Sequence, residues 1–238
     1  DGGAPQLLTP EDADHDVSFA PSGTCFVDSY SRMDLPPVTV LRAADGTTIA
    51  TLEEANVESL QATGWPFPER FSAKARDGET DVYGVIFRPS NFDPSQRYPV
   101  IDSIYAGPQV NQAPLSFADC ARGRGARFWQ EQAMAELGFV VVMIDGIGMP
   151  YRAKSFHDVA YGNLGDGGLP DHISALHELA GRYPYLDLDR VGIFGHSAGG
   201  YASAHAIFAH PDFYKVCVTS AGNHDHRLDK ASWVERYM

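Results

Sequence analysis

Short apolar segments separated by turn residues make up the first sixty residues of the chain. Val, Thr, Phe, Ile and Tyr dominate these segments, and the clusters Pro21-Ser-Gly23, Leu35-Pro-Pro37 and Ala44-Asp-Gly46 lie between them. This pattern is typical of short β-strands joined by turns. We therefore predict strands over residues 15–19, 25–31, 38–42 and 47–52. Four such strands form a sheet with exposed edges, which neighbouring sheets stabilise in a β-propeller; a small meander packed on the main domain is the alternative.

After Thr63 the pattern changes to strands that alternate with helices. A proline-rich linker, Trp65-Pro-Phe-Pro68, precedes a hairpin whose turn is Arg76-Asp-Gly78. Further strands are predicted over residues 100–105, 139–144, 191–194 and 217–221, and helices over 128–137, 171–182 and 201–210. This alternation predicts an α/β fold with a mostly parallel sheet and helices on both faces, in which ligands bind beyond the carboxyl ends of the strands.

The segment Val191-Gly-Ile-Phe-Gly-His-Ser-Ala-Gly-Gly-Tyr201 places Ser197 between a buried strand and a helix. In a G-x-S-x-G turn the serine is strained and exposed, and the residues two before and two after it must lack side chains. Gly195 and Gly199 occupy those positions. The backbone N–H of Ala198 would then point at an oxyanion formed on Ser197. The alternative is a glycine-rich turn in which Ser197 only caps the helix.

Two other predicted strands end beside this turn. Tyr105 follows the first parallel strand, and its hydroxyl could donate a second hydrogen bond to an oxyanion, or the side chain could cap the core. Asp145 follows the second, where a structural carboxylate that accepts hydrogen bonds from loop amides is the better interpretation.

Composition excludes several classes of partner. The chain has 238 residues, of which 18 are Lys or Arg and 31 are Asp or Glu, so the net charge is −13. Nucleic acid and anionic membranes are therefore unfavourable partners. Cys25, Cys120 and Cys217 are widely spaced and form no C-x-x-C, so neither a zinc site nor a disulfide framework is predicted. The run Gly162–Gly168 lacks the Lys-Ser/Thr of a phosphate-binding loop and the strand before it, so we interpret it as a flexible loop, and no cofactor or metal is predicted.

Several motifs along the chain resemble, in order and spacing, the dipeptidyl peptidase IV branch of the prolyl oligopeptidase family. They are FAPSG (19–23), VDSYSRMDLPPVTVLRAADG (27–46), YAGP (105–108), AELGFVVVMIDGIG (135–148), RAKSFHD (152–158), DLDRVGIFGHSAGGY (187–201), HPDFYKV (210–216) and WVERYM (233–238). The resemblance implies that residues 1–62 are the last part of a β-propeller and residues 63–238 the N-terminal part of an α/β-hydrolase domain.

The resemblance also implies the roles of individual residues. It makes Ser197 the nucleophile of a serine peptidase, with the Ala198 N–H and the Tyr105 hydroxyl as the oxyanion hole. Trp233 and Tyr237 could form the walls of the pocket for the residue before the cleaved bond. Asp229 stands where the family usually has a tyrosine, and Ala198 where better-known members carry an aromatic residue, so a proline preference is in doubt.

A base and its orienting acid are not evident in the sequence. Hydrolases of this fold carry the triad in the order Ser, Asp, His, and only 41 residues follow Ser197. His196 is adjacent to Ser197 and diverges from it, and His224 and His226 more plausibly serve their own loop than act as a base or a metal pair. We therefore expect a fragment that is inactive alone.

For the intact protein we expect hydrolysis of peptide substrates, possible homodimers, and an unknown location for which family resemblance somewhat favours export. The alternatives are an esterase or acyl-aminoacyl hydrolase on the same fold, and a non-catalytic interaction protein.

Overall fold

The computed structural model describes residues 4–117 and 125–238, with the backbone alone for residues 125–128. It divides into two compact units. The first comprises Asp1–Phe67 with Pro114–Trp129, and the second comprises Pro68–Ala113 with Gln130–Met238.

Cys25 and Cys217 are free thiols, while Cys120 lies outside the described residues. None of the helices in the described part of the chain has the length and apolar character that a membrane span requires.

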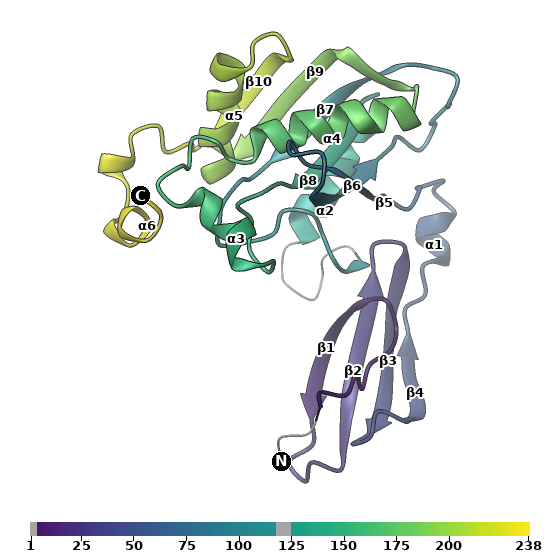
Figure 1. The fold of residues 1–238 in the computed structure, drawn as a ribbon. Coiled ribbons are helices and arrows are strands. Elements are labelled where there is room, and N and C mark those ends of the chain that lie inside the picture. Colours follow the sequence, from purple (N-terminus) through teal and green to yellow (C-terminus); the bar gives the residue numbers. More distant parts are fainter. Residues whose placement is uncertain (1–3, 118–124) are drawn as a thin grey trace. The chain divides into compact units, whose positions relative to one another are not determined.

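The first unit contains a four-stranded antiparallel meander in the order β1-β2-β3-β4, followed by a single helical turn, α1 (Figure 1). The elements are β1 (Asp14–Phe19), β2 (Cys25–Arg32), β3 (Leu35–Ala43), β4 (Thr48–Glu54) and α1 (Glu58–Gln61). The four predicted strands are confirmed. The predicted break at Leu35-Pro-Pro37 is wrong, because β3 begins at Leu35 and the two prolines occupy its first positions, where a strand tolerates proline.

A buried charge network holds the meander together. The Asp28 carboxylate in β2 is fully buried and accepts hydrogen bonds from Arg42 Nε and His15 Nδ1, both at 2.8 Å. Arg42 also donates through Nη2 to Glu11 Oε1 at 2.7 Å. Among the described residues, Glu11, His15 and Asp28 are the one cluster of potential metal ligands, and the guanidinium of Arg42 already pairs with both of its carboxylates.

The second unit contains a six-stranded sheet in the order β10-β9-β7-β8-β6-β5 (Figure 1). β10, β9, β7 and β8 are parallel, whereas β6 is antiparallel to β8 and to β5. The strands are β5 (Glu69–Lys74), β6 (Asp81–Phe87), β7 (Tyr98–Ile104), β8 (Val140–Asp145), β9 (Leu186–His196) and β10 (Tyr214–Ser220). The predicted hairpin and mostly parallel sheet are confirmed, and their buried Val, Ile and Leu side chains form the core.

Helices cover both faces of this sheet. Successive residues of a strand point to opposite faces of the sheet. The contacts of Asp102 and Ser103, which are neighbours in β7, therefore identify the helix on each face. Asp102 accepts a hydrogen bond from His172 in α4, whereas the Ser103 hydroxyl donates to Glu131 in α2 at 2.7 Å. These helices are α2 (Gly125–Ala135) and α4 (Leu169–Arg182), and α5 (Ala198–Ala209) packs on β9 and β10.

The structure extends some predicted elements and adds others. β9 begins at Leu186 instead of Val191, because Leu186 and Asp187 already pair with Tyr98 and Pro99 at the start of β7. α5 begins at Ala198 instead of Tyr201, so two glycines lie in its first turn. The short elements that the sequence pattern did not predict are α1, α3 (Lys154–His157), η2 (Asp158–Ala160), η3 (His226–Leu228) and α6 (Ala231–Tyr237).

Candidate active site

Ser197 lies at the junction of β9 and α5 in a conformation that side-chain-bearing residues rarely adopt. Its φ is 61° and its ψ is −118°. Such a conformation costs about 1–3 kcal/mol and persists only where the surrounding structure imposes it. Here the Ser197 N–H donates to the carbonyl of Ser220 at 2.9 Å, and its carbonyl accepts the N–H of Tyr201. Ser197 occupies the N-cap position of α5 but makes no side-chain capping bond, so its hydroxyl is not used as a helix cap.

The glycines around Ser197 allow three backbone segments to approach closely. A Cβ atom on Gly195 would lie 2.1 Å from the carbonyl oxygen of Gly199. On Gly199 it would lie 2.2 Å from the carbonyl oxygen of Ile104, at the end of β7. On Gly200 it would lie 2.3 Å from the carbonyl oxygen of Ser220, at the end of β10. Any side chain at these positions would push the helix away from the strand ends, so the turn requires glycine there.

Ser197 opens into a cavity of about 180 Å³. The cavity is lined by residues from the loop after β7, the loop before α4, the start of α5, the loop after β10 and α6. They are Tyr105, Ala106, Gln109, Leu164, Ser197, Ala198, Tyr201, Ala202, Ala221, Asn223, His226, Asp229, Lys230 and Trp233. Five residues singled out from the sequence thus line one cavity: Ser197, Ala198, Tyr105, Asp229 and Trp233. Tyr237 does not line it; this buried ring packs edge-on against Trp233, with centroids 4.9 Å apart, and faces a second cavity of about 590 Å³.

Tyr105 is held at the cavity by the loop that follows β7. Its hydroxyl accepts a hydrogen bond from Gln109 Nε2 at 3.0 Å. The next residue, Ala106, has a positive φ of 58°, so the chain turns sharply just after the tyrosine. This turn sends the chain away from the sheet while the Tyr105 ring stays beside Ser197.

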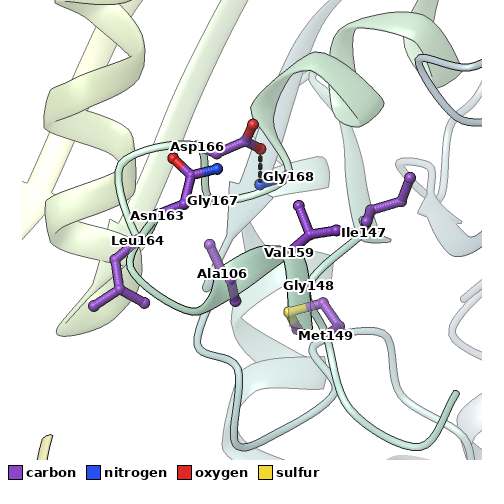
Figure 2. A pocket seen from close by; sticks show the side chains of 11 residues that line it. Ala106, Ile147, Gly148, Met149, Val159, Asn163, Leu164, Asp166, Gly167 and Gly168 are labelled. Carbon is purple, nitrogen blue, oxygen red and sulfur yellow. Dashed lines mark hydrogen bonds between the residues drawn. The ribbon is translucent and has the colours of Figure 1, made fainter. Parts of the chain in front are cut away.

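The glycine-rich segment Gly162–Gly168 packs next to that turn. Figure 2 shows Ala106 facing this segment across a small pocket. The volume of the pocket is about 10 Å³, the room of roughly one water molecule. Asp166 accepts the N–H of Gly168 at 3.0 Å, and its carboxylate forms an ion pair with Arg76. Arg76 also binds Asp171, at the start of α4, at 2.8 Å. The segment was expected from the sequence to be a flexible loop; in the structure it is a turn held by the ion pair of Asp166 with Arg76.

Polar side chains from the loop after β10 form one wall of the cavity. Asn223 Nδ2 donates to Asp229 Oδ2 at 2.9 Å and to His226 Nδ1 at 3.1 Å. Asp229 Oδ1 accepts the backbone N–H of Lys230 at 2.7 Å. The His226 ring packs edge-on against Tyr201, with centroids 4.6 Å apart. His226 serves its own loop, as the sequence indicated. Asn223 was not identified from the sequence; its position shortly after the end of β10 was the available signal.

The described residues offer no base to Ser197. Within that part of the chain, no side chain or backbone group is hydrogen-bonded to the Ser197 hydroxyl. His196 points elsewhere, since its Nδ1 lies 3.0 Å from the hydroxyl of Ser220. His226 Nδ1 is engaged by Asn223, as described above. The structural interpretation of Asp145 is confirmed, because its Oδ1 accepts the backbone N–H groups of Gln112 and Ala113.

A second polar cluster, missed by the sequence analysis, lies buried beneath the site. Asp102 Oδ1 accepts His172 Nδ1 at 2.9 Å, and Asp102 Oδ2 accepts the Tyr214 hydroxyl at 2.8 Å. All three side chains are almost completely buried. Burial disfavours the charged form of His172, but the Asp102 carboxylate outweighs that effect and raises the pKa of His172. Burial, together with the Asp102 charge, raises the pKa of Tyr214 well above its ordinary value. The cluster joins β7, α4 and β10, three elements that lead into the site loops.

Comparison with known proteins gives a family match and relatives that are named dipeptidyl peptidases. The family model described as "Prolyl oligopeptidase family" matches residues 125–238. Human dipeptidyl peptidase 8 is 34% identical over 171 residues, which cover 72% of this chain and 18% of that protein. Dipeptidyl peptidase 4 of Trichophyton tonsurans is 28% identical over 243 residues, which cover 98% of this chain and 30% of that protein.

A solved structure extends the likeness to the fold. The crystal structure of a protein described as a dipeptidyl aminopeptidase IV of Bacteroides ovatus superimposes with a TM-score of 0.84 and 29% identity. The match covers 98% of this chain and 32% of that one. The chain thus spans less than a third of the length of these relatives, and both units of the chain fall within the matched part.

Proposed function

Because the chain belongs to the prolyl oligopeptidase family, in its dipeptidyl peptidase branch, we propose that Ser197 is the nucleophile of a serine peptidase. In the reaction, Ser197 Oγ attacks the carbonyl carbon of the scissile peptide bond while its proton passes to a base. The resulting tetrahedral intermediate collapses to an acyl-enzyme when the C–N bond breaks and the amine leaves with a proton. Water then hydrolyses the ester by the same steps in reverse order.

The single observation that carries this proposal is the strained conformation of Ser197 at the N-terminus of α5, with its hydroxyl free of capping bonds. Backbone strain of this kind is maintained where it serves a function. A turn residue without a chemical role could be replaced by glycine, which adopts a positive φ at no cost.

We assign the oxyanion hole to the Ala198 N–H and the Tyr105 hydroxyl. The N–H groups in the first turn of a helix have no partner within the helix, and the helix dipole favours negative charge there. Both groups belong to residues that line the same cavity as Ser197. Each such donor lowers the barrier by about 3 kcal/mol where it is aimed at the developing oxyanion.

We propose that the base and the acid that orients it are not among the residues that the structure describes. The support is geometric, since the described residues place no hydrogen-bond acceptor on the Ser197 hydroxyl. The isolated chain should then react poorly with substrates at Ser197, and it should not catalyse repeated peptide hydrolysis. The protein from the complete gene should be active on peptides, with residues 1–62 belonging to a propeller domain and residues 63–238 to the hydrolase domain.

The turn that carries Ser197, here called the elbow, and the oxyanion hole do not determine which acyl group the enzyme accepts. The test is to compare dipeptide anilides of varied second residue with short acyl esters, using protein expressed from the complete gene and its Ser197→Ala variant. We expect anilide hydrolysis with the higher kcat/KM, reduced to background in Ser197→Ala. Faster ester hydrolysis with little anilide hydrolysis would identify an esterase instead. Inertness toward both would favour a non-catalytic interaction protein.

A further inference from the structure

The cavity beside Ser197 carries an acidic side chain that no cation neutralises directly. Asp229 is half-buried, and both of its oxygens accept hydrogen bonds from neutral donors, the Asn223 side chain and the Lys230 backbone. Across residues 4–117 and 125–238, no Lys, Arg or His lies within ion-pair distance of Asp229. These neutral donors orient the carboxylate and leave its charge in place.

The rest of the cavity suits a long side chain with a charged end. Trp233, Leu164, Ala198 and Ala202 contribute apolar surface, against which a methylene chain can pack. Asn223, His226 and Asp229 form the polar wall, in which Asp229 is the one acidic group. The one cation that lines the cavity is Lys230, whose side chain belongs to an exposed residue and forms no ion pair with Asp229.

We propose that this cavity takes the side chain of the residue before the cleaved bond and that Asp229 selects a cationic one, lysine or arginine. The proposal rests on the proposed function, because that side chain is placed in the cavity only if the carbonyl of its residue is the one that Ser197 attacks. A carboxylate at the end of such a pocket selects basic residues in trypsin-like peptidases. A proline ring brings no cation to that carboxylate and would exclude solvent from it, so proline should be disfavoured.

The hydrogen bonds of Asp229 make an isosteric test available. In Asp229→Asn the size and shape of the side chain are kept and its charge is lost. The remaining oxygen can accept one of the two hydrogen bonds, from the Asn223 side chain or from the Lys230 N–H, and the other bond is given up. Asp225→Asn is the matched control. It removes the same charge four residues away, where the Asp225 carboxylate pairs with the exposed Arg227, outside the cavity. Lys230→Gln is a third variant, and it should strengthen the preference because it removes the one nearby positive charge.

The experiment measures competition with a fluorophosphonate that labels Ser197, in protein expressed from the complete gene. The competitors are the dipeptide boronic acids Ala-boroLys and Ala-boroNle, which differ by the lysine ammonium group alone, and Ala-boroPro. We expect the inhibition constant of Ala-boroLys to be lower than that of Ala-boroNle by roughly tenfold to a hundredfold, the range of a charge-assisted hydrogen bond. Asp229→Asn should abolish that difference, and Asp225→Asn should retain it.

The outcomes separate this proposal from the proposed function. Normal labelling with equal inhibition by Ala-boroLys and Ala-boroNle, or a difference that survives in Asp229→Asn, would overturn the selection by Asp229 and leave the serine peptidase intact. Tighter binding of Ala-boroPro than of Ala-boroLys would do the same. Failure of the fluorophosphonate to label the protein at all would overturn both.

Discussion

The carbonyl oxygen of Gly199 lies 2.1 Å from the position that a Cβ atom of Gly195 would occupy. This approach brings the end of β9 and the first turn of α5 together around Ser197. A Cβ on Gly199 meets a second backbone segment, the carbonyl of Ile104 at 2.2 Å. The elbow is therefore a junction of three backbone segments, and it has consequences that can be measured.

Gly199→Ala should both destabilise the protein and remove the reactivity of Ser197. The added methyl group must displace backbone instead of a flexible side chain, so we expect a loss of about 1–3 kcal/mol in the free energy of unfolding. Chemical denaturation measures that loss, and fluorophosphonate labelling measures the reactivity.

Gly181→Ala is the control for that change. Gly181 lies in α4, and nothing lies within 4 Å of a Cβ placed there, so alanine should stabilise the helix by up to about 1 kcal/mol and leave labelling unchanged. Equal behaviour of the two variants would show that the close approach at the elbow has no energetic importance.

Tyr105→Phe should slow acylation of Ser197 without unfolding the protein. The change removes a hydroxyl that accepts a hydrogen bond from the exposed Gln109 side chain. Loss of one oxyanion donor costs about a hundredfold to a thousandfold in rate. The rate of peptide anilide hydrolysis by protein from the complete gene measures the effect. The exposed Tyr151→Phe should change nothing, and a fall of less than threefold for Tyr105→Phe would remove Tyr105 from the oxyanion hole.

Tyr214→Phe should destabilise the second unit, because it deprives the buried Asp102 carboxylate of one of its hydrogen bonds. A hydrogen bond to a buried charged group contributes about 1.5–3 kcal/mol, so we expect a loss of that size in the free energy of unfolding. Tyr83→Phe, at an exposed position in β6, should stay within about 0.5 kcal/mol of the parent protein. Similar losses in the two variants would argue against the buried cluster as a stabilising feature.

The Asp102–His172 pair should also make stability depend on pH. The pKa of His172 is higher in the folded state than its ordinary value of 6.5, so folding favours its protonated form. The stabilisation from the charged pair is complete below pH 6.5 and is lost as pH rises through the raised pKa of His172. We expect the stability advantage over His172→Gln, measured by denaturation between pH 5 and 9, to shrink with rising pH. An advantage that grows toward high pH would contradict this account.

Arg42→Met should destabilise the first unit strongly. Arg42 pairs with the fully buried Asp28 and with Glu11, and its loss leaves the Asp28 charge with His15 as its remaining partner. Breaking a buried ion pair costs about 3–5 kcal/mol. In contrast, Arg227→Met breaks an ion pair whose arginine is 88% exposed, and it should cost less than about 1 kcal/mol. Denaturation monitored by tryptophan fluorescence compares the two, and a cost below 1 kcal/mol for Arg42→Met would be unexpected.

The sequence predicted the sheets well because runs of Val, Ile and Phe between turn residues have few other stable arrangements. The elbow was also predictable, since it requires glycine two residues before and two residues after a serine, a pattern that five consecutive residues contain in full. Short helices such as α3 and α6 were not predicted. They are one or two turns long, and packing around them decides their conformation more than any periodic pattern does.

The polar contacts were the least predictable part of the site. Asp102 sits between apolar residues in β7, which signals that a buried partner exists, but His172 and Tyr214 lie 70 and 112 residues further on. The wall formed by Asn223, His226 and Asp229 depends on how η3 folds back after β10. The residues next to one another in the sequence do not determine such long-range contacts, and only a family resemblance pointed to Asp229.

The central claim is that Ser197 is a nucleophile, and peptide mapping after fluorophosphonate labelling tests it most directly. Protein from the complete gene is labelled, digested and analysed by mass spectrometry beside its Ser197→Ala variant and a heat-denatured sample. The account predicts one adduct, on the peptide that contains Ser197, which is absent from both controls. An adduct on another serine such as Ser203 or Ser220, or equal labelling of the Ser197→Ala variant, would contradict it.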